Sequence, residues 1–252
     1  MFKYALVRKP AESMIHGITR MDLGKPEFQK ALNQHDEYCK ALKKCGLAIV
    51  EIPAEPNFPD SVFVEDTAIV TEKCAIITFP GHVNRRGEEL SVASKLAEFR
   101  TLEYIKYPGT LDGGDIMRAE NHFFIGLSDR TNKEGAEQLM KLLAKYGHTS
   151  SMIAIDKMLH LKTGINYVGN QTLVMIDSLL SMKGFDDYKK ISIPDEESYA
   201  ANCLLINDYL LVAKGFESAK KTFVNAGFKI IELEMSEYMK LDGGLSCLSL
   251  RF

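Results

Sequence analysis

The sequence lacks a C-x-x-C pair, although it contains five cysteines: Cys39, Cys45, Cys74, Cys203 and Cys247. An odd number of cysteines without that spacing argues against a disulfide framework and against a structural zinc site. A cysteine that contributes to function is therefore expected to act as a free thiol.

Long apolar runs and basic blocks are absent as well. No apolar run approaches the length of a membrane-spanning helix, and the N-terminal MFKYALVRKP is too short and too soon charged for a secretory signal. The 31 basic and 34 acidic side chains give a formal charge of -3, without a cluster of cations that would follow a phosphate backbone. We therefore expect a globular, cytoplasmic protein that binds neither nucleic acid nor membrane.

No low-complexity segment and no linker rich in proline, glycine or serine divides the chain, whose 252 residues are long enough to bury a full core. Residues 1–252 are therefore expected to form a single domain. The segment AESMIHGITRMDLGKP, residues 11–26, is long, contains two glycines and has no core pattern. It is either a lid or an ordinary surface loop.

The chain repeats one unit four times: a strand, a short polar turn, a second strand, an amphipathic helix and a third strand. In the first copy DTAIV, TEK and CAIITF precede a helix through GEELSVASKLAEFR and the strand LEYIKY. The second copy runs from GDIMR through HFFIGL and EGAEQLMKLLAKYG to SMIAID. The third is weaker, with INYV, QTLVMID, a short helix around FDDYKK and ISIP, and the fourth joins NCLLI, YLLVAKG, FESAKKTFVNAG and FKIIELE.

A fifth unit is expected from the two ends of the chain. The C-terminal strand LSCLSL, the N-terminal strand KYALVR, a helix that begins near Pro26 and the strand LAIVEI complete it. Pairing the two ends would close a ring and leave no free sheet edge. The sequence thus predicts an α/β fold of five strand-strand-helix-strand units with pseudo-five-fold symmetry, in which the tail that carries Cys247 is held in place.

Polar side chains with catalytic potential recur just before, or at, the first strand of these units. In chain order they are Glu65, Asp66, Asp112, His160, Asp242 and Cys247. Asp112 and Asp242 belong to two copies of the same sequence, LDGG. If the first strands line the axis of a ring, these side chains meet in one central pocket.

Cys247 is the candidate nucleophile, because it follows two glycines that allow close approach of the backbone and occupies a position equivalent to that of His160. The alternative for Cys247 is a buried hydrophobic role, which is what we expect of the other four cysteines. From the pattern alone, a catalytic and a structural role for His160 are equally compatible with the sequence.

The acidic residues favour a cationic substrate. Carboxylates around a thiol raise its pKa and repel anions, an arrangement that suits neither a peptidase nor an acyl transferase. A guanidinium ion is planar, and its N–H groups can donate two parallel hydrogen bonds to one carboxylate. Asp66 and Asp112 could therefore hold a guanidinium below Cys247. The alternative for Asp66 in VEDT is an acidic pair at a strand edge.

Basic residues at the junction of second strand and helix complement these acids. Arg85 or Arg86, in FPGHVNRRGEE, and Arg130, in IGLSDRTNKEG, either clamp a carboxylate at the pocket mouth or are ordinary surface arginines. A guanidinium at one end and a carboxylate at the other describe arginine or a close derivative.

Six segments in order along nearly the whole chain resemble the dimethylarginine dimethylaminohydrolases: NFPDSVFVEDTAIV, LDGGDIM, IGLSDRTNKEGA, LHLKTG, EESYAANC and DGGLSCLSLRF. This family belongs to the guanidino-group-modifying superfamily, whose pentein fold is a five-bladed α/β propeller. The resemblance implies that fold, and a hydrolase that converts N-omega-methylated arginines, asymmetric dimethylarginine or monomethylarginine, to citrulline and a methylamine. No metal or organic cofactor is implied, and the outer helices of such a propeller often pair in a homodimer.

The resemblance also implies the mechanism. Cys247 attacks the guanidinium carbon and forms a covalent thiouronium, while His160 acts first as general acid and then as general base. Asp66 and Asp112 bind the guanidinium, and Asp112 also orients His160. Bacterial members of the family carry Glu where this chain has Asp112, so its side chain is shorter by one methylene.

The remaining implied residues bind the amino-acid part of the substrate. Asp60 would receive the α-amino group, and Arg85 with Arg130 the carboxylate. Glu65 and Ile18 are further substrate-binding residues by the same resemblance. The alternatives are an enzyme that acts on another guanidine, similar to arginine deiminases or amidinotransferases, both of which are longer, and a guanidine-binding protein without turnover.

Overall fold

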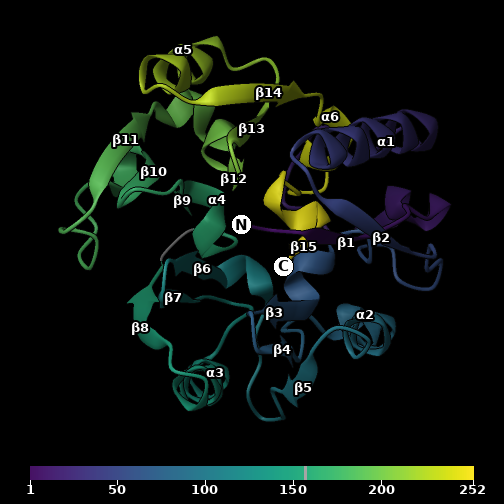
Figure 1. Ribbon diagram of the computed structural model, residues 1–252. Helices are drawn as coiled ribbons and strands as arrows, with labels where there is room; N and C mark the ends of the chain where they lie inside the picture. The colour runs from purple at the N-terminus through teal and green to yellow at the C-terminus, as the bar shows by residue number, and fades with distance from the viewer. Residues whose placement is uncertain (156–157) are drawn as a thin grey trace.

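The structure is a computed structural model that describes residues 1–155 and 158–252. Within these residues, short strands form five separate three-stranded sheets, arranged around a common centre like the blades of a propeller (Figure 1). The predicted five-bladed α/β propeller with repeated strand-strand-helix-strand units is confirmed.

Every blade has the same strand pattern, in which the middle strand pairs antiparallel with the inner strand and parallel with the outer one. From inner to outer, the strands are β3 (Ala68–Val70), β4 (Cys74–Ile77) and β5 (Thr101–Tyr104); β6 (Ile116–Ala119), β7 (His122–Leu127) and β8 (Thr149–Ala154); β9 (Ile165–Tyr167), β10 (Thr172–Ile176) and β11 (Lys189–Ile193); β12 (Leu204–Ile206), β13 (Tyr209–Ala213) and β14 (Lys229–Leu233); and β15 (Leu250–Arg251), β1 (Tyr4–Arg8) and β2 (Ala48–Ile52).

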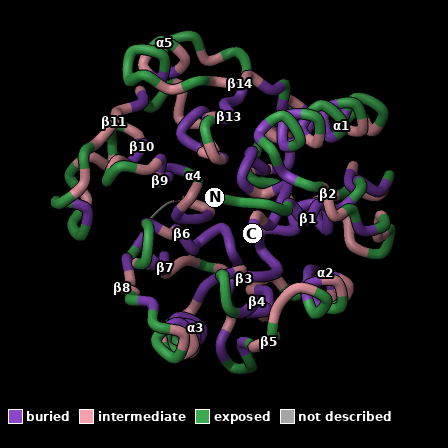
Figure 2. The backbone as a smooth tube through the Cα atoms, viewed as in Figure 1, coloured by how far each residue is buried: buried purple, intermediate pink, exposed green. Residues whose placement is uncertain are grey.

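Helices make the crossover that a parallel pair of strands requires. In four blades the middle and outer strands are joined by α1 (Phe28–Lys44), α2 (Glu88–Leu96), α3 (Lys133–Lys145) and α5 (Glu217–Asn225). These helices lie on the outside and bury one face against their blade, whereas the backbone around the centre is mostly buried (Figure 2). No helix in the described part of the chain has both the length and the apolar character needed to cross a membrane.

The third blade departs from the prediction. The short helix expected around FDDYKK is wrong, because this segment forms a turn and then enters β11 at Lys189. Phe185 at its start is fully buried and packs on Phe124 at a ring-centroid distance of 4.8 Å. The residues between this core contact and the strand are too few for a stable helix. The predicted strand SMIAID ends at residue 156, which lies outside the described residues.

The fifth blade joins the two ends of the chain, as predicted. β15 pairs antiparallel with β1, with Ala5 opposite Arg251 and Leu6 opposite Leu250. The expectation that closure leaves no free sheet edge is wrong, because each blade is its own three-stranded sheet with two edges. Blades meet through side chains instead of a continuous ladder. The predicted strand LSCLSL is also shorter, since its first half forms a 3-10 turn.

A short helical turn precedes each inner strand, and we call these five segments the inner turns. They are η2 (Val64–Thr67), η4 (Gly113–Asp115), α4 (Leu161–Gly164), η6 (Asp195–Ala201) and η7 (Ser246–Leu248). Because all five inner strands lie near the propeller centre (Figure 1), residues in or beside the inner turns approach one another from every blade.

Candidate active site

All five inner turns contribute to one cavity of about 40 Å³ at the centre of the propeller. Its lining residues are Glu65, Gly114, His160, Lys162, Thr163, Tyr199, Asn202, Asp242, Gly244, Ser246 and Cys247. This cavity therefore brings together Cys247, His160 and two of the acidic residues that the sequence pattern singled out, Glu65 and Asp242. A cavity of this size holds water molecules but not an amino acid.

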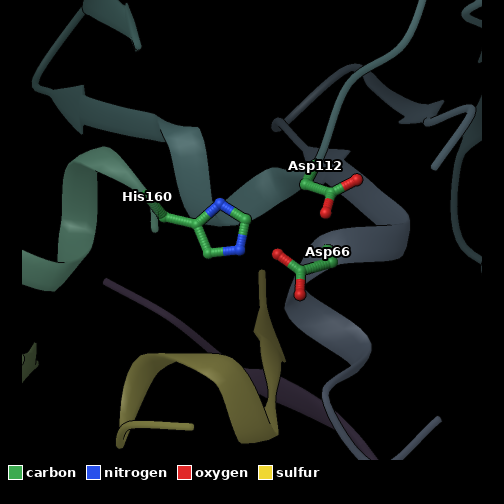
Figure 3. Close-up of side chains that lie close together, drawn as sticks. All are labelled: Asp66, Asp112 and His160. Atoms are coloured by element: carbon green, nitrogen blue, oxygen red, sulfur yellow. The ribbon is translucent and has the colours of Figure 1, made fainter. Parts of the chain in front are cut away.

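Two carboxylates and an imidazole face one another beside this cavity. Asp66, Asp112 and His160 point toward a common space (Figure 3), and one ligand atom of each lies within 4.8 Å of the others. The backbone N–H of Gly114 donates to Oδ1 of Asp66 at 2.8 Å, and that of Gly81 donates to Oδ1 of Asp112 at 2.9 Å. The other oxygen of Asp112 is buried without a partner among the described residues. Such a group suits a planar cation or a metal ion.

The glycine pairs of the two LDGG sequences have a steric function. A Cβ on Gly114 would lie 2.8 Å from Cγ of His160, and a Cβ on Gly113 would lie 1.9 Å from a backbone oxygen. In the second copy, a Cβ on Gly243 would lie 2.2 Å from the ring of Phe63, and one on Gly244 would lie 2.5 Å from the side chain of Asn202. Both copies therefore bring an inner turn close to its neighbours, which a residue with a side chain would prevent.

Charges around this group set its protonation. Burial alone would raise the pKa of Asp66, but Arg85 and His160 outweigh burial and hold it below its usual range. Burial and then Asp66 raise the pKa of Asp112 to about 6. Burial lowers the pKa of His160, yet nearby carboxylates, Asp115 first, raise it to about 9. At neutral pH His160 is therefore protonated and Asp66 is ionised.

Cys247 is half-buried, at the centre of η7. The backbone N–H of Gly244 donates to its sulfur at 3.4 Å. Burial and then Glu65 and Asp66 raise the pKa of Cys247 to about 12. In the free protein the group is therefore a thiol, and only an additional positive charge nearby would favour the thiolate.

The orienting partner of His160 differs from the one implied by the resemblance. Oδ2 of Asp115, not a carboxylate oxygen of Asp112, lies 3.3 Å from Nδ1 of His160. Asp115 is itself fixed, because Ser128 and Thr131 donate to Oδ2 at 2.7 and 2.6 Å. The shorter side chain of Asp112 and the location of Asp115 one turn further on account for the difference. Asp115 was not predicted; the second acid of LDGGD is the sequence signal that could have found it.

Arg85 is placed differently from the prediction of a clamp at the pocket mouth. It is buried, and Nη1 donates to Oδ2 of Asp66 at 2.6 Å. Nε and Nη2 both donate to Oε2 of Glu88, at 3.1 and 2.8 Å, and Nη2 also reaches the carbonyl of Phe63. This guanidinium is fully occupied inside the protein, where it neutralises Asp66. A buried arginine between two acids looks the same as a surface arginine in a local sequence window.

Arg130 differs from Arg85, since Nη1 of Arg130 is buried and has no hydrogen-bonding partner in the described ranges. Its charge acts on Asp60, a buried carboxylate whose pKa burial raises above its usual value, while Arg85 and Arg130 offset only part of that rise. A cation with a free donor and a carboxylate thus lie within electrostatic reach of each other, a pair that complements the zwitterionic end of an amino acid.

The segment 11–26 is docked on the site by two carboxylates. The backbone N–H of Ile18 donates to Oδ1 of Asp60 at 2.9 Å, and that of Arg20 donates to Oδ2 of Asp242 at 2.6 Å. Ile18 therefore contributes its backbone to the site. Asp242, whose φ of 59° lies in the left-handed region, both turns the chain before η7 and holds this segment. These contacts favour the interpretation of residues 11–26 as a lid.

Glu65 lines the cavity, but it is not one of the two carboxylates that face the position expected for the guanidinium. Its Oε1 contacts Nζ of Lys162 at 2.7 Å and Nη2 of Arg251 at 2.9 Å, and its Oε2 accepts from Oγ of Ser246 at 2.6 Å. Both oxygens are occupied by these partners. Lys162 and Arg251 were not predicted from the sequence. Lys162 follows His160 by two residues in LHLKTG, and this proximity is the signal that could have found it.

Comparison with known proteins identifies the family. A family model described as N,N dimethylarginine dimethylhydrolase, eukaryotic, matches residues 20–248. The chain is 44% identical to the N(G),N(G)-dimethylarginine dimethylaminohydrolase of Pseudomonas aeruginosa, over all of both chains. The chain belongs to the dimethylarginine dimethylaminohydrolase family. Another dimethylarginine dimethylaminohydrolase, from Streptomyces coelicolor, is 31% identical over 99% of this chain and 96% of its own.

Solved structures of dimethylarginine dimethylaminohydrolase superpose closely on this chain. The P. aeruginosa enzyme, as a cysteine-to-serine mutant complexed with citrulline, has a TM-score of 0.98 and 44% identity, with all of both chains covered. The N-terminal domain of ArgZ, covalently bound to a reaction intermediate, has a TM-score of 0.87 at 19% identity over 98% of this chain and 97% of its own. At that identity ArgZ shows a shared fold.

Proposed function

We propose that this protein hydrolyses N-omega-methylated arginines, such as asymmetric dimethylarginine and monomethylarginine, to citrulline and a methylamine. The observation that carries the proposal is the group of two facing carboxylates, Asp66 and Asp112, next to His160 and the cavity of Cys247. The full-length identity to a dimethylarginine dimethylaminohydrolase supports it, as does the complex of that enzyme's mutant with citrulline.

The first step transfers the substrate carbon to Cys247. Ionised Asp66 and Asp112 hold the guanidinium flat, and the positive charge of the substrate favours the thiolate of Cys247, whose proton leaves to solvent. The sulfur attacks the guanidinium carbon, a C–S bond forms, and the C–N bond to the methylated nitrogen breaks. His160, protonated at neutral pH, gives its proton to the departing amine.

The second step releases citrulline. His160, now neutral, removes a proton from water, which attacks the carbon of the S-alkylthiouronium. The C–S bond breaks, the sulfur takes up the second proton of the water, and Cys247 returns as a thiol. Asp115 favours one orientation of the imidazole through its charge, because its Oδ2 lies 3.3 Å from Nδ1 without hydrogen-bond geometry, and Nε2 is left for the reacting atoms.

The amino-acid end of the substrate binds where the lid contacts the site. Asp60 and the backbone carbonyl of Ile18 accept hydrogen bonds from the α-ammonium group, and the free donor of Arg130 binds the α-carboxylate. Arg85 does not contact the substrate in this proposal; its ion pair with Asp66 keeps that carboxylate ionised. The cavity of about 40 Å³ is too small for an amino acid, so the lid must move before the substrate binds.

The test is release of citrulline and amine from asymmetric dimethylarginine, monomethylarginine and arginine, each measured at several concentrations. We expect turnover of the methylated substrates to exceed that of arginine. One methyl group changes binding by only about 1 kcal/mol, so the ranking comes from measurement of kcat/KM for each compound. Equal or greater turnover of arginine would contradict the assignment to methylated arginines.

The two LDGG copies provide a matched pair of variants. Asp112→Asn keeps size but removes charge that compensates a buried cation, a loss of about 2 to 5 kcal/mol in transition-state binding. Asp242→Asn keeps an acceptor for Arg20 and a residue that tolerates the left-handed region, so its cost is about 1 kcal/mol of stability or less. We expect the first variant to lose kcat/KM at a near-normal melting temperature. The reverse pattern in kinetics and thermal unfolding would show that the wrong copy has been assigned to the substrate.

Asp115→Asn tests the positioning of His160. Removing the carboxylate nearest to Nδ1 lowers the pKa of His160, so the acid form is lost at a lower pH. We expect kcat to fall about 100-fold with little change in KM, and the alkaline limb of the pH–kcat profile to move to lower pH. An unshifted alkaline limb would assign Asp115 a purely structural role.

Four broader predictions stay proposals. We propose that residues 1–252 form one guanidine-modifying hydrolase domain, which the pairing of the first and last strands supports. A cytoplasmic location and a homodimer are proposed from the sequence alone. A small-molecule methylated arginine is the partner that the site chemistry favours.

A further inference from the structure

A charged cluster of three residues, Glu65, Lys162 and Arg251, forms the floor beneath Cys247. Glu65 is the shared partner, at 2.7 Å from the ammonium of Lys162 and 2.9 Å from the guanidinium of Arg251. Ser246, the residue before Cys247, donates to the other oxygen of Glu65. Two cations and one anion leave this floor with a net charge of +1.

The position of the floor connects it to the thiol. Glu65 and Lys162 line the small catalytic cavity together with Cys247. The same two residues, with Arg251, also line a separate cavity of about 610 Å³. The floor is thus a charged partition between the two cavities, and Lys162 faces both of them.

Neutralising Glu65 requires one cation, and Arg251 already supplies it. Arg251 is held independently of Glu65, because its Nη1 donates to the backbone carbonyls of Ser246 and Ser249. Lys162 has Glu65 as its single ion-pair partner within the described residues. An ammonium group has three donors, so two remain for the cavity that Lys162 lines. Lys162 therefore adds charge in excess of what Glu65 needs.

Every element around Cys247 contributes charged or titratable groups. They are Glu65 and Asp66 from η2, Asp112 and Asp115 at η4, His160 and Lys162 at α4, Tyr199 from η6, Asp242 before η7 and Arg251 from β15. His160 must be protonated to serve as the acid and loses its charge during the reaction. Lys162 and Arg251 take no part in the proton transfers, and Lys162 is the one of these two that lines the catalytic cavity.

We propose that Lys162 stabilises the thiolate of Cys247 by giving the floor of the catalytic cavity a net positive charge. The inference rests on the proposed function only in taking Cys247 as the nucleophile. It adds a second, permanent source of positive charge to that of the substrate. Burial, Glu65 and Asp66 oppose ionisation of Cys247, whereas the N–H of Gly244 and the charge of Lys162 lower its pKa.

The experiment measures alkylation of Cys247 by iodoacetamide as a function of pH in the substrate-free protein. Mass spectrometry of the peptide that contains Cys247 separates it from the other four cysteines, and the rate follows the thiolate fraction. We expect Lys162→Met to raise the apparent thiol pKa by about one unit, and Lys162→Arg to restore most of the wild-type value. Glu65→Gln is expected to lower the thiol pKa, because both cations then act without their anion.

The test is specific because the thiol pKa is expected to rise in Lys162→Met and to fall in Glu65→Gln. General disturbance of the floor would move the thiol pKa of Lys162→Met and Glu65→Gln in the same direction, and that result, or no shift in either, would overturn the proposal. Lys220→Met is the matched control, because it breaks a lysine–glutamate pair of equal length, 2.7 Å to Glu232, on the outside of a blade. No substrate is used, so absence of dimethylarginine turnover would contradict the proposed function without affecting this measurement.

Discussion

Cys247→Ser is expected to abolish turnover of dimethylarginine, with kcat lower by on the order of 10⁵-fold and a melting temperature close to that of the wild type. A hydroxyl is a far weaker nucleophile than a thiolate, and the substrate's charge cannot ionise it. The fold should persist because Cys247 is half-buried and the N–H of Gly244, which donates to its sulfur, suits an oxygen equally well. Citrulline release and thermal unfolding are the two measurements.

Cys39→Ser is the control for that variant. Cys39 is also a half-buried free thiol, but it lies on α1 at the outside of the propeller, 3.7 Å from Nδ1 of His35. It should retain wild-type turnover. Substantial activity in Cys247→Ser would remove Cys247 from the mechanism, and loss of activity in the control would show that serine acts by disturbing the fold.

His160→Gly is expected to fail in both chemical steps. The variant lacks the acid that protonates the amine and the base that activates water, so kcat should fall by about 10³-fold or more. A substrate whose leaving group is a thiol needs no protonation, and it should still form the adduct on Cys247. Hydrolysis of that adduct needs the base. We therefore expect the thiouronium to accumulate, as a mass increase of the intact protein.

The control for His160→Gly is His122→Gly, since His122 hydrogen-bonds Thr149 and Ser151 on the surface of the second blade. That variant should turn over substrate without accumulating an adduct. Wild-type rates of citrulline release in His160→Gly would end the acid–base assignment. Absence of adduct with a thiol leaving group would show that His160 is needed to place the substrate itself.

The architecture was predictable because it repeats. Each unit carries its own periodicity, and the repeat placed Cys247 and His160 at equivalent positions before any contact was known. The helix at FDDYKK was predicted by analogy with the other units, and there the burial of Phe185 decided otherwise. A repeat predicts the average unit, and each copy can still replace a helix by a turn.

The site was predictable in its members but less so in their contacts. Asp66, Asp112 and His160 come from different blades, so their mutual arrangement depends on long-range packing that a sequence window does not contain. Arg85 was expected to clamp a carboxylate at the pocket mouth and lies inside, because Glu88 one helical turn away provides a second acid for it. Glu65 likewise forms ion pairs with Lys162 and Arg251, which are distant from it in the sequence.

The pairing of β1 with β15 sets an order in which the protein assembles. During synthesis from the N-terminus, β1 waits with one edge unpaired until the last strand has been made, and such distant pairings form late. Four blades carry Asp66, Asp112, His160 and Tyr199 beside their inner strands, and they complete their sheets before η7 exists. The carboxylates of the site are thus made before the nucleophile, and a chain that stops short of residue 247 lacks the thiol that the proposed reaction requires.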